Sequence, residues 1–250
     1  MTDGMEKFKE KFAGFEEMYA LIGGTACDLL MEDAGLDFRR TKDFDIVLII
    51  EAINEDYGKA FWKFIEEGGY SIKERSDGSP VFYRFQNPSD ASYPKEIELF
   101  SRKSSVLDHS SDSRLTPIHI SEDLSSLSAI LLDEEYYSFL KSGLALIDGV
   151  HVLNYTHIIP FKAKAWLDLT QRKNNGEGID SKKIDKHKRD IFRLSQLITG
   201  NDNVELPEEI YSDMTRFIDS MATEVVDLKS MKIQSSKTAI IETLKRVYSI

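Results

Sequence analysis

Two segments decide the fold: Leu21-Ile-Gly-Gly-Thr-Ala26 and Asp43-Phe-Asp-Ile-Val-Leu-Ile-Ile50, the second beginning nineteen residues after Gly24. The first predicts a short strand, a Gly-Gly turn and a helix that begins near Thr25. The second predicts a buried strand that opens with paired acids. Because successive side chains of a strand point to opposite faces, Asp43 and Asp45 are expected on the same face.

These residue types suit a site for a metal ion and a phosphate. Two neighbouring carboxylates repel each other unless a positive charge lies between them, and Mg2+ that carries a substrate phosphate is a common solution. A Gly-Gly turn lets the backbone approach a phosphate closely, and the helix after it directs free N–H groups at the anion. Taken singly, an acid pair is more often a solvated strand edge and Gly-Gly an ordinary turn. Their order along the chain favours the site.

Composition narrows the function classes. The chain has 250 residues, 41% hydrophobic and 30% charged residues, and one cysteine, Cys27. No apolar run reaches the roughly 20 residues that span a bilayer, and the first residues lack the pattern of a signal peptide. A single cysteine cannot form an internal disulfide. We therefore expect a cytoplasmic protein with no membrane partner, in which Cys27 is a small buried side chain.

Charge is distributed unevenly. The net charge of -11 opposes broad nucleic-acid binding, because an acidic surface repels phosphates. Residues 161–193 carry ten Lys or Arg and five Asp or Glu, so this segment has a net charge of +5 and the rest of the chain -16. This basic segment could meet a nucleoside triphosphate or an RNA end. The alternative is a solvated helical face.

The order of elements indicates an α+β fold of α/β-like character, with a mixed β-sheet flanked by helices. Asp148-Gly149 predicts a tight hairpin within 144–153, and the Ser-rich stretch 101–113 a loop. From Thr156, the expected N-cap, the pattern becomes helical, with later helices near 181, 207 and 235. This divides the chain into an α/β domain, 1–155, and a helical domain, 156–250. Earlier helices are expected at 6–19, 25–32 and 56–67, and strands at 20–22, 43–50, 70–74, 81–85 and 96–101.

The expected strand Lys95-Glu-Ile-Glu-Leu-Phe100 carries two further acids that could join this site. Glu96 and Glu98 share one face of it. Only Glu98 has apolar neighbours on both sides, as in a central buried strand, so Glu98 is preferred over Glu96.

The helix over 158–173 places Lys162 in the middle of its apolar arc and Lys164 on the polar side. The next helix places Asp190 beside its own apolar arc. An inward lysine is costly unless it is paired with an anion or reaches a site. A structural bridge from Lys162 to Asp190 and a contact with a nucleotide therefore remain as two alternatives.

Together these motifs resemble the polymerase-beta-like nucleotidyltransferase superfamily, in its AbiEii-type branch, which includes toxins of type IV toxin-antitoxin systems. The resemblance rests on Ile22-Gly-Gly-Thr-Ala26, Arg39-x-Thr41-x-Asp43-Phe-Asp45, Phe161-Lys-Ala-Lys-Ala-Trp-Leu-Asp-Leu169 and Lys186-His-Lys-Arg-Asp-Ile-Phe-Arg-Leu194.

The resemblance implies a nucleotidyltransferase fold followed by a helical region. It implies Mg2+ or Mn2+ on Asp43, Asp45 and Glu98. It also implies a triphosphate held by Gly23, Gly24 and Thr25, with Arg39 and Thr41 bracing the acid strand or the nucleotide. Lys162 matches a lysine that contacts the nucleotide, and Asp190 the acid that supports it.

The activity implied is transfer of a nucleoside monophosphate from an NTP to an acceptor hydroxyl, with release of pyrophosphate. The acceptor could be an RNA end, a protein or a cationic small molecule, and an antitoxin or regulator protein is a further expected partner. Two alternatives stay open: a non-catalytic nucleotide-sensing or partner-binding module, and an aminoglycoside-type small-molecule nucleotidyltransferase. The acidic composition departs from that of toxins that engage tRNA, which weakens the case for an RNA acceptor.

Overall fold

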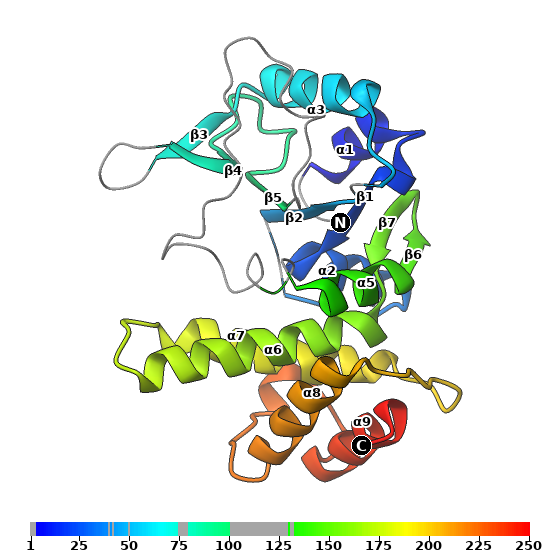
Figure 1. Ribbon diagram of the computed structural model, residues 1–250, viewed down its shortest axis with the longest axis vertical. Helices are drawn as coiled ribbons and strands as arrows, with labels where there is room; N and C mark the ends of the chain where they lie inside the picture. The colour runs from blue at the N-terminus through cyan, green and yellow to red at the C-terminus, as the bar shows by residue number, and fades with distance from the viewer. Residues whose placement is uncertain are drawn as a thin grey trace. The chain divides into compact units, whose positions relative to one another are not determined.

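The computed structural model describes residues 4–39, 41, 43–49, 51–74, 80–100, 130 and 133–250. The chain forms two compact units (Figure 1). The first contains the described residues of Met1–Asp123 together with Leu144–Leu153, and the second those of Leu124–Gly143 together with Asn154–Ile250. The boundary expected at 155/156 lies two residues from the last crossing between the units. The described residues of 124–143, a segment that the sequence placed in the first domain, group with the second unit.

The first unit is built on a seven-stranded mixed sheet in the order β3-β4-β5-β2-β1-β7-β6. β2 runs antiparallel to β1 and parallel to β5, while β7 runs parallel to β1. The strands are β1 (Tyr19–Ile22), β2 (Asp43–Leu48), β3 (Ser71–Glu74), β4 (Pro80–Gln86), β5 (Glu96–Phe100), β6 (Leu144–Ile147) and β7 (Val150–Leu153). All seven coincide with strands expected from the sequence, whereas the expected loop at 101–113 lies outside the described residues.

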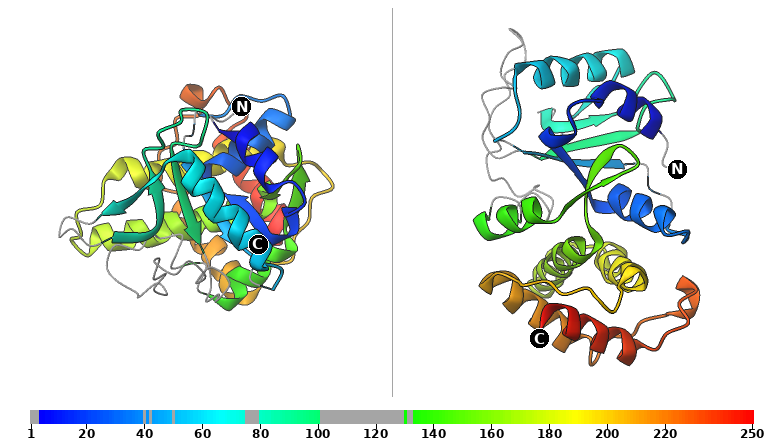
Figure 2. Two further views of the ribbon diagram at one scale, coloured as in Figure 1. Left: turned by 90° about the horizontal axis from the view of Figure 1, so that it is seen from above. Right: turned by 90° about the vertical axis from the view of Figure 1, so that its right-hand side faces the viewer.

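Helices cover both sides of this sheet. α1 (Met5–Phe12) and α3 (Glu55–Gly68) lie on one side and α2 (Gly23–Asp33) on the other (Figure 2). The side under α1 and α3 is an aromatic core, in which Phe8 packs edge-on against Tyr19 and Phe44 at 5.1 and 5.5 Å between ring centroids. Burial of these large rings stabilises the packing of α1 against β1 and β2.

Local signals account for several of the element ends. The Asn54 side chain accepts a hydrogen bond from the Tyr57 N–H at the start of α3, and Gly69 ends this helix in the left-handed conformation. The hairpin between β6 and β7 turns at Asp148 and Gly149, both with positive φ, as predicted. The helix expected over 6–19 was too long: α1 ends at Phe12, because Gly14 adopts a φ of +87°.

The second unit is helical. It contains α5 (Glu134–Ser142), α6 (Tyr155–Asn174), α7 (Ser181–Leu194), α8 (Glu208–Ser220) and α9 (Lys237–Tyr248). α5 was not predicted, and Thr156 lies inside α6, so its expected role as N-cap was wrong. Of the helices within the described ranges, none has the length and apolar character needed to cross a membrane.

Candidate functional site

Asp45 belongs to a row of residues that are paired across four neighbouring strands of the sheet. The register pairs Asp45 of β2 with Ile22 at the end of β1 and with Glu98 of β5. Glu98 in turn pairs with Arg84 of β4. Directly paired residues share a face of the sheet, so Asp45, Glu98 and Arg84 lie side by side on the face opposite the buried Phe44 and Ile97.

The Gly-Gly turn lies against this row. Gly23 begins α2 with a φ of +64°, and a Cβ atom at this position would lie 1.8 Å from Oδ2 of Asp45. The close approach explains why glycine is needed here, because any side chain would displace the Asp45 carboxylate. The amino end of α2 is thereby placed beside an acid of β2, as the sequence predicted.

The segment before β2 is held against the first turn of α2. The Thr25 hydroxyl donates a hydrogen bond to the main-chain carbonyl of Asp43 at 2.7 Å, and its Oγ1 lies 3.1 Å from that of Thr41. A Cβ on Gly24 would meet the side chains of Thr41 and Arg39 at 3.0 and 3.3 Å. The residues assigned to nucleotide binding in the first unit therefore gather around one turn.

Glu98 has a partner that sequence reasoning missed. Nε of Arg84 lies 3.0 Å from Oε1 of Glu98, and the two side chains are 24% and 18% exposed. Arg84 is the single cation in β4 and alternates with the buried Phe85, a pattern that could have placed it on the polar face. Glu96, the alternative third acid, pairs in register with Asp43.

The acids suit a hard divalent cation in their chemistry and lie in neighbouring register positions. Carboxylate oxygens are the ligands that Mg2+ prefers, and Asp43, Asp45 and Glu98 occupy adjacent positions on one face. Across the described part of the chain, however, no three His, Cys, Asp or Glu side chains converge closely enough to hold a metal ion. The ion pair of Glu98 with Arg84 gives a physical reason, since the guanidinium already satisfies this carboxylate.

Lys162 and Asp190 belong to the second unit, where they form a pair between α6 and α7. Nζ of Lys162 lies 2.9 Å from Oδ2 of Asp190, and the two side chains are 6% and 0% exposed. Arg193 approaches the other carboxylate oxygen at 3.6 Å. The inward direction predicted for Lys162 is confirmed. This contact is also the bridge that the structural alternative predicted.

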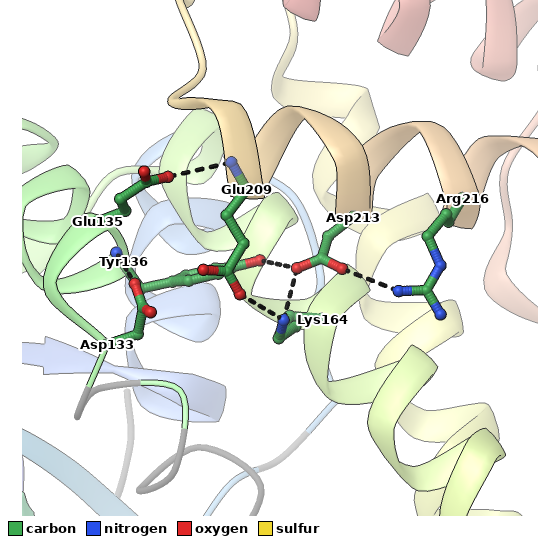
Figure 3. A network of polar contacts seen from close by, with 7 residues as sticks. All are labelled: Asp133, Glu135, Tyr136, Lys164, Glu209, Asp213 and Arg216. Atoms are coloured by element: carbon green, nitrogen blue, oxygen red, sulfur yellow. Dashed lines mark hydrogen bonds and ion pairs between the residues drawn. The ribbon is translucent and has the colours of Figure 1, made fainter.

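Lys164 is engaged as well, in a network that joins α5, α6 and α8 (Figure 3). Its Nζ donates hydrogen bonds to Asp213 at 2.7 Å and to Glu209 at 3.0 Å. The Tyr136 hydroxyl donates to the same Asp213 oxygen as Lys164 does. Burial lowers the pKa of Lys164, but the hydrogen bonds to Asp213 and Glu209 outweigh it, so the pKa is raised above its ordinary value.

The basic segment is largely neutralised by acids. Lys188, for example, reaches Glu224 at 2.6 Å, and Arg172 reaches Glu177 at 2.8 Å. The cations of 161–193 in ion pairs include Lys162, Lys164, Arg172, Lys188, Arg189 and Arg193. The segment therefore fits the solvated and bridged helical face better than a surface for polyanions.

Comparison with known proteins bears on the fold. The structure is similar, at a TM-score of 0.50 and 16% sequence identity, to an antigenic nucleotidyltransferase-like protein from Paracoccidioides brasiliensis. The alignment covers 97% of this chain and 90% of that one. The chain has a nucleotidyltransferase-like fold.

A weaker likeness, with a TM-score of 0.37 and 12% identity, extends over 92% of this chain and 98% of the antibiotic-resistance factor ANT(2'')-Ia, and no inference rests on it. No family model and no curated protein sequence matches the chain. The α+β class and the nucleotidyltransferase-like fold expected from the sequence are confirmed at the level of the fold.

Proposed function

We propose that this protein transfers a nucleoside monophosphate from an NTP to an acceptor hydroxyl and releases pyrophosphate. One observation carries the proposal: the amino end of α2, at Gly23, packs directly against Asp45 of the acid-headed strand. A helix amino end offers N–H groups to phosphates, and the acids beside it can hold the cation that accompanies them. The nucleotidyltransferase-like fold supports this reading.

Each residue has a role in this proposal. Gly23, Gly24 and Thr25 bind the triphosphate, while Thr41 and Arg39 brace the segment that leads into β2. Thr25 also anchors the start of β2 through its bond to Asp43. Because phosphoryl chemistry of this kind depends on positioning and charge neutralisation, no covalent nucleophile is required.

Asp43 and Asp45 would hold Mg2+ or Mn2+, with Glu98 as the third acid. Such a cation neutralises phosphate charge and lowers the pKa of an attacking hydroxyl. Asp43 is exposed and Asp45 half-buried, so both are accessible to a hydrated cation. Glu98 is preferred over Glu96 because it shares the row of Asp45.

For Lys162 and Asp190, the resemblance and the structure support different roles. The resemblance implies that Lys162 contacts the nucleotide, whereas its buried pair with Asp190 supports a structural role. A small-molecule or protein acceptor fits the acidic composition and the neutralised basic segment better than an RNA end. Membership of the AbiEii-type branch, a toxin-like role, a regulator partner and a cytoplasmic location remain parts of this proposal.

Calorimetry tests the site. Mg2+ and a nonhydrolysable NTP should bind in a coupled manner to the parent protein, and Asp43→Asn or Asp45→Asn should abolish the coupling without unfolding the protein. Asp33→Asn, an exposed acid at the end of α2, is the matched control and should bind as the parent does. Unchanged coupled binding in both site variants would overturn the site.

A transfer assay separates the enzyme from a nucleotide-sensing module. Labelled NTPs with Mg2+ or Mn2+ are offered to RNA, protein and cationic small molecules in separate reactions. The expected result is label on one acceptor class, lost in Glu98→Gln while NTP binding persists. Coupled NTP binding with no transfer to any acceptor would favour the sensing module.

A further inference from the structure

The row that contains Asp45 and Glu98 is completed by a cation from outside the predicted acid set. Glu98 lies between Asp45 on one neighbouring strand and Arg84 on the other. The Arg84–Glu98 pair is a close contact of 3.0 Å between side chains that are 24% and 18% exposed. Glu98 is therefore flanked by a like charge and by an opposite charge in the same row.

The carboxylates of Asp45 and Glu98 repel each other in this arrangement. Like charges directly opposite each other on neighbouring strands destabilise the pairing, and partial burial strengthens the repulsion. A guanidinium beside Glu98 offsets this repulsion. A divalent cation on Asp43 and Asp45 would offset it too. Arg84 and the cation therefore compensate the same negative charge.

We infer that Arg84 is a positioning residue, which offsets the charge of Glu98 beside Asp45 until a cation binds and becomes less important for stability once the cation is present. This inference rests on the proposed function, because it assumes that the acids receive a divalent cation. It assigns to β4, which carries none of the predicted site residues, a part in forming the site. Arg84 acts through Glu98 and not through contact with the substrate.

Melting temperatures of the full-length chain, in chelator and in saturating Mg2+, test the inference. In chelator, Arg84→Met should melt about 5 °C below the parent, because Arg84 no longer contributes to offsetting the repulsion between Asp45 and Glu98. Mg2+ should recover at least half of this loss. The double variant Arg84→Met/Glu98→Gln should recover it in chelator, because one of the two like charges is gone.

Lys11→Met is the matched control. Lys11 of α1 pairs with Glu67 of α3 in the same unit, with similar exposure of 26% and 35%. These two helices cover the side of the sheet away from the acid row (Figure 2). The loss in melting temperature of Lys11→Met should be the same with and without Mg2+. A Mg2+-dependent loss in this variant would overturn the inference, because the effect would not be specific to the row.

The remaining outcomes are distinct. An Arg84→Met loss that is equal in chelator, in Mg2+ and in the double variant would show an ordinary bridge and overturn the inference. If the parent binds no Mg2+ but the double variant still recovers the loss, the proposed metal site fails and the charge-balancing role of Arg84 stands. If Arg84→Met does not fold in chelator, Arg84→Lys replaces it, because lysine keeps the positive charge. Arg84→Lys should then melt near the parent. An Arg84→Lys protein that also fails to fold in chelator would overturn the inference.

Discussion

At the scale of single residues, the contact between Gly23 and Asp45 is the most constrained feature of the site. The glycine combines a left-handed backbone with a carboxylate that occupies the space of a Cβ atom. Gly35, just after α2, has a similar φ of +70° but no atom within 4 Å of its would-be Cβ. An alanine at Gly35 would therefore suffer backbone strain alone, whereas an alanine at Gly23 would also collide with Asp45.

Gly35→Ala should cost about 1 to 2 kcal/mol of unfolding free energy, the usual cost of a left-handed alanine. Gly23→Ala should cost at least about 3 kcal/mol, because the collision with Asp45 adds to that strain. Denaturant unfolding measures both values. Equal losses would show that Asp45 moves away freely and that the contact is not tight.

His157 provides a pH-dependent effect in the second unit. Its ring stacks on Phe139 at 4.3 Å between centroids, and burial lowers its pKa to about 4. The unfolded chain takes up a proton near pH 6.5, whereas the folded chain does not until about pH 4. The unfolded state therefore binds more protons in this window, and stability falls as the pH falls through it.

Over this window His157 should remove up to about 3 kcal/mol of stability from the parent. His157→Phe keeps an aromatic ring on Phe139 but cannot titrate. Unfolding free energies of both proteins at pH 7, 5.5 and 4 should diverge by this amount, with the variant showing the flatter dependence. Parallel pH curves would contradict the neutral state of the half-buried His157.

The residues show which parts of the site could be predicted. Turn chemistry predicted Gly23 with Thr25, and strand alternation predicted Asp43 with Asp45, because the members of each pair are two residues apart. Only the order of these motifs along the chain suggested that the two pairs share a site. Arg84 was missed because its partner is brought to it by strand pairing, and the register between β4 and β5 cannot be read from either strand alone.

At the scale of elements, the α6–α7 pair shows what periodicity can and cannot establish. The apolar arcs correctly directed Lys162 inward and gave its bridge to Asp190 as one alternative, but periodicity does not decide between a bridge and a contact with a nucleotide. Lys164, expected on the polar side, instead binds the buried Asp213 of α8, an element far along the chain. Contacts of this kind depend on tertiary packing, which cannot be predicted from the periodicity of a single helix.

The buried pair leads to a prediction for α6 and α7. Lys162→Ala should cost about 3 to 5 kcal/mol, because Asp190 would keep a buried charge without this partner. Lys162→Met/Asp190→Asn should recover more than half of that loss, whereas Lys182→Ala, exposed on α7, should change stability by less than about 0.5 kcal/mol. Urea unfolding measures all three. A Lys162→Ala protein as stable as the parent would favour the nucleotide-contact role implied by the resemblance.

At the scale of the whole molecule, the path of the chain between the units is the main departure from the expected division at 155/156. The chain enters the second unit before α5, returns to the first for β6 and β7, and enters the second again at Asn154. Nothing in the composition of this region marks these crossings. They follow from β7 pairing with β1 and from Tyr136 of α5 packing edge-on against Phe161 at 5.1 Å.

A fragment of residues 1–155 should therefore aggregate. It retains α5, whose Tyr136 is fully buried in the whole protein, but lacks Phe161 and Asp213, which Tyr136 contacts. The same fragment with 124–143 replaced by a Gly-Ser linker of equal length should elute as a monomer in size-exclusion chromatography. Aggregation of both fragments would show that the first unit does not fold alone.

The returning hairpin also sets the order in which the protein can fold as it leaves the ribosome. β1 is made early, yet its neighbour β7 emerges only after α5 has been synthesised. Until then, one edge of β1 has no strand beside it, and the nascent sheet ends at a row of unpaired backbone groups. The emergence of residue 153 from the ribosome therefore ends the period in which this edge is open to pairing with another nascent chain.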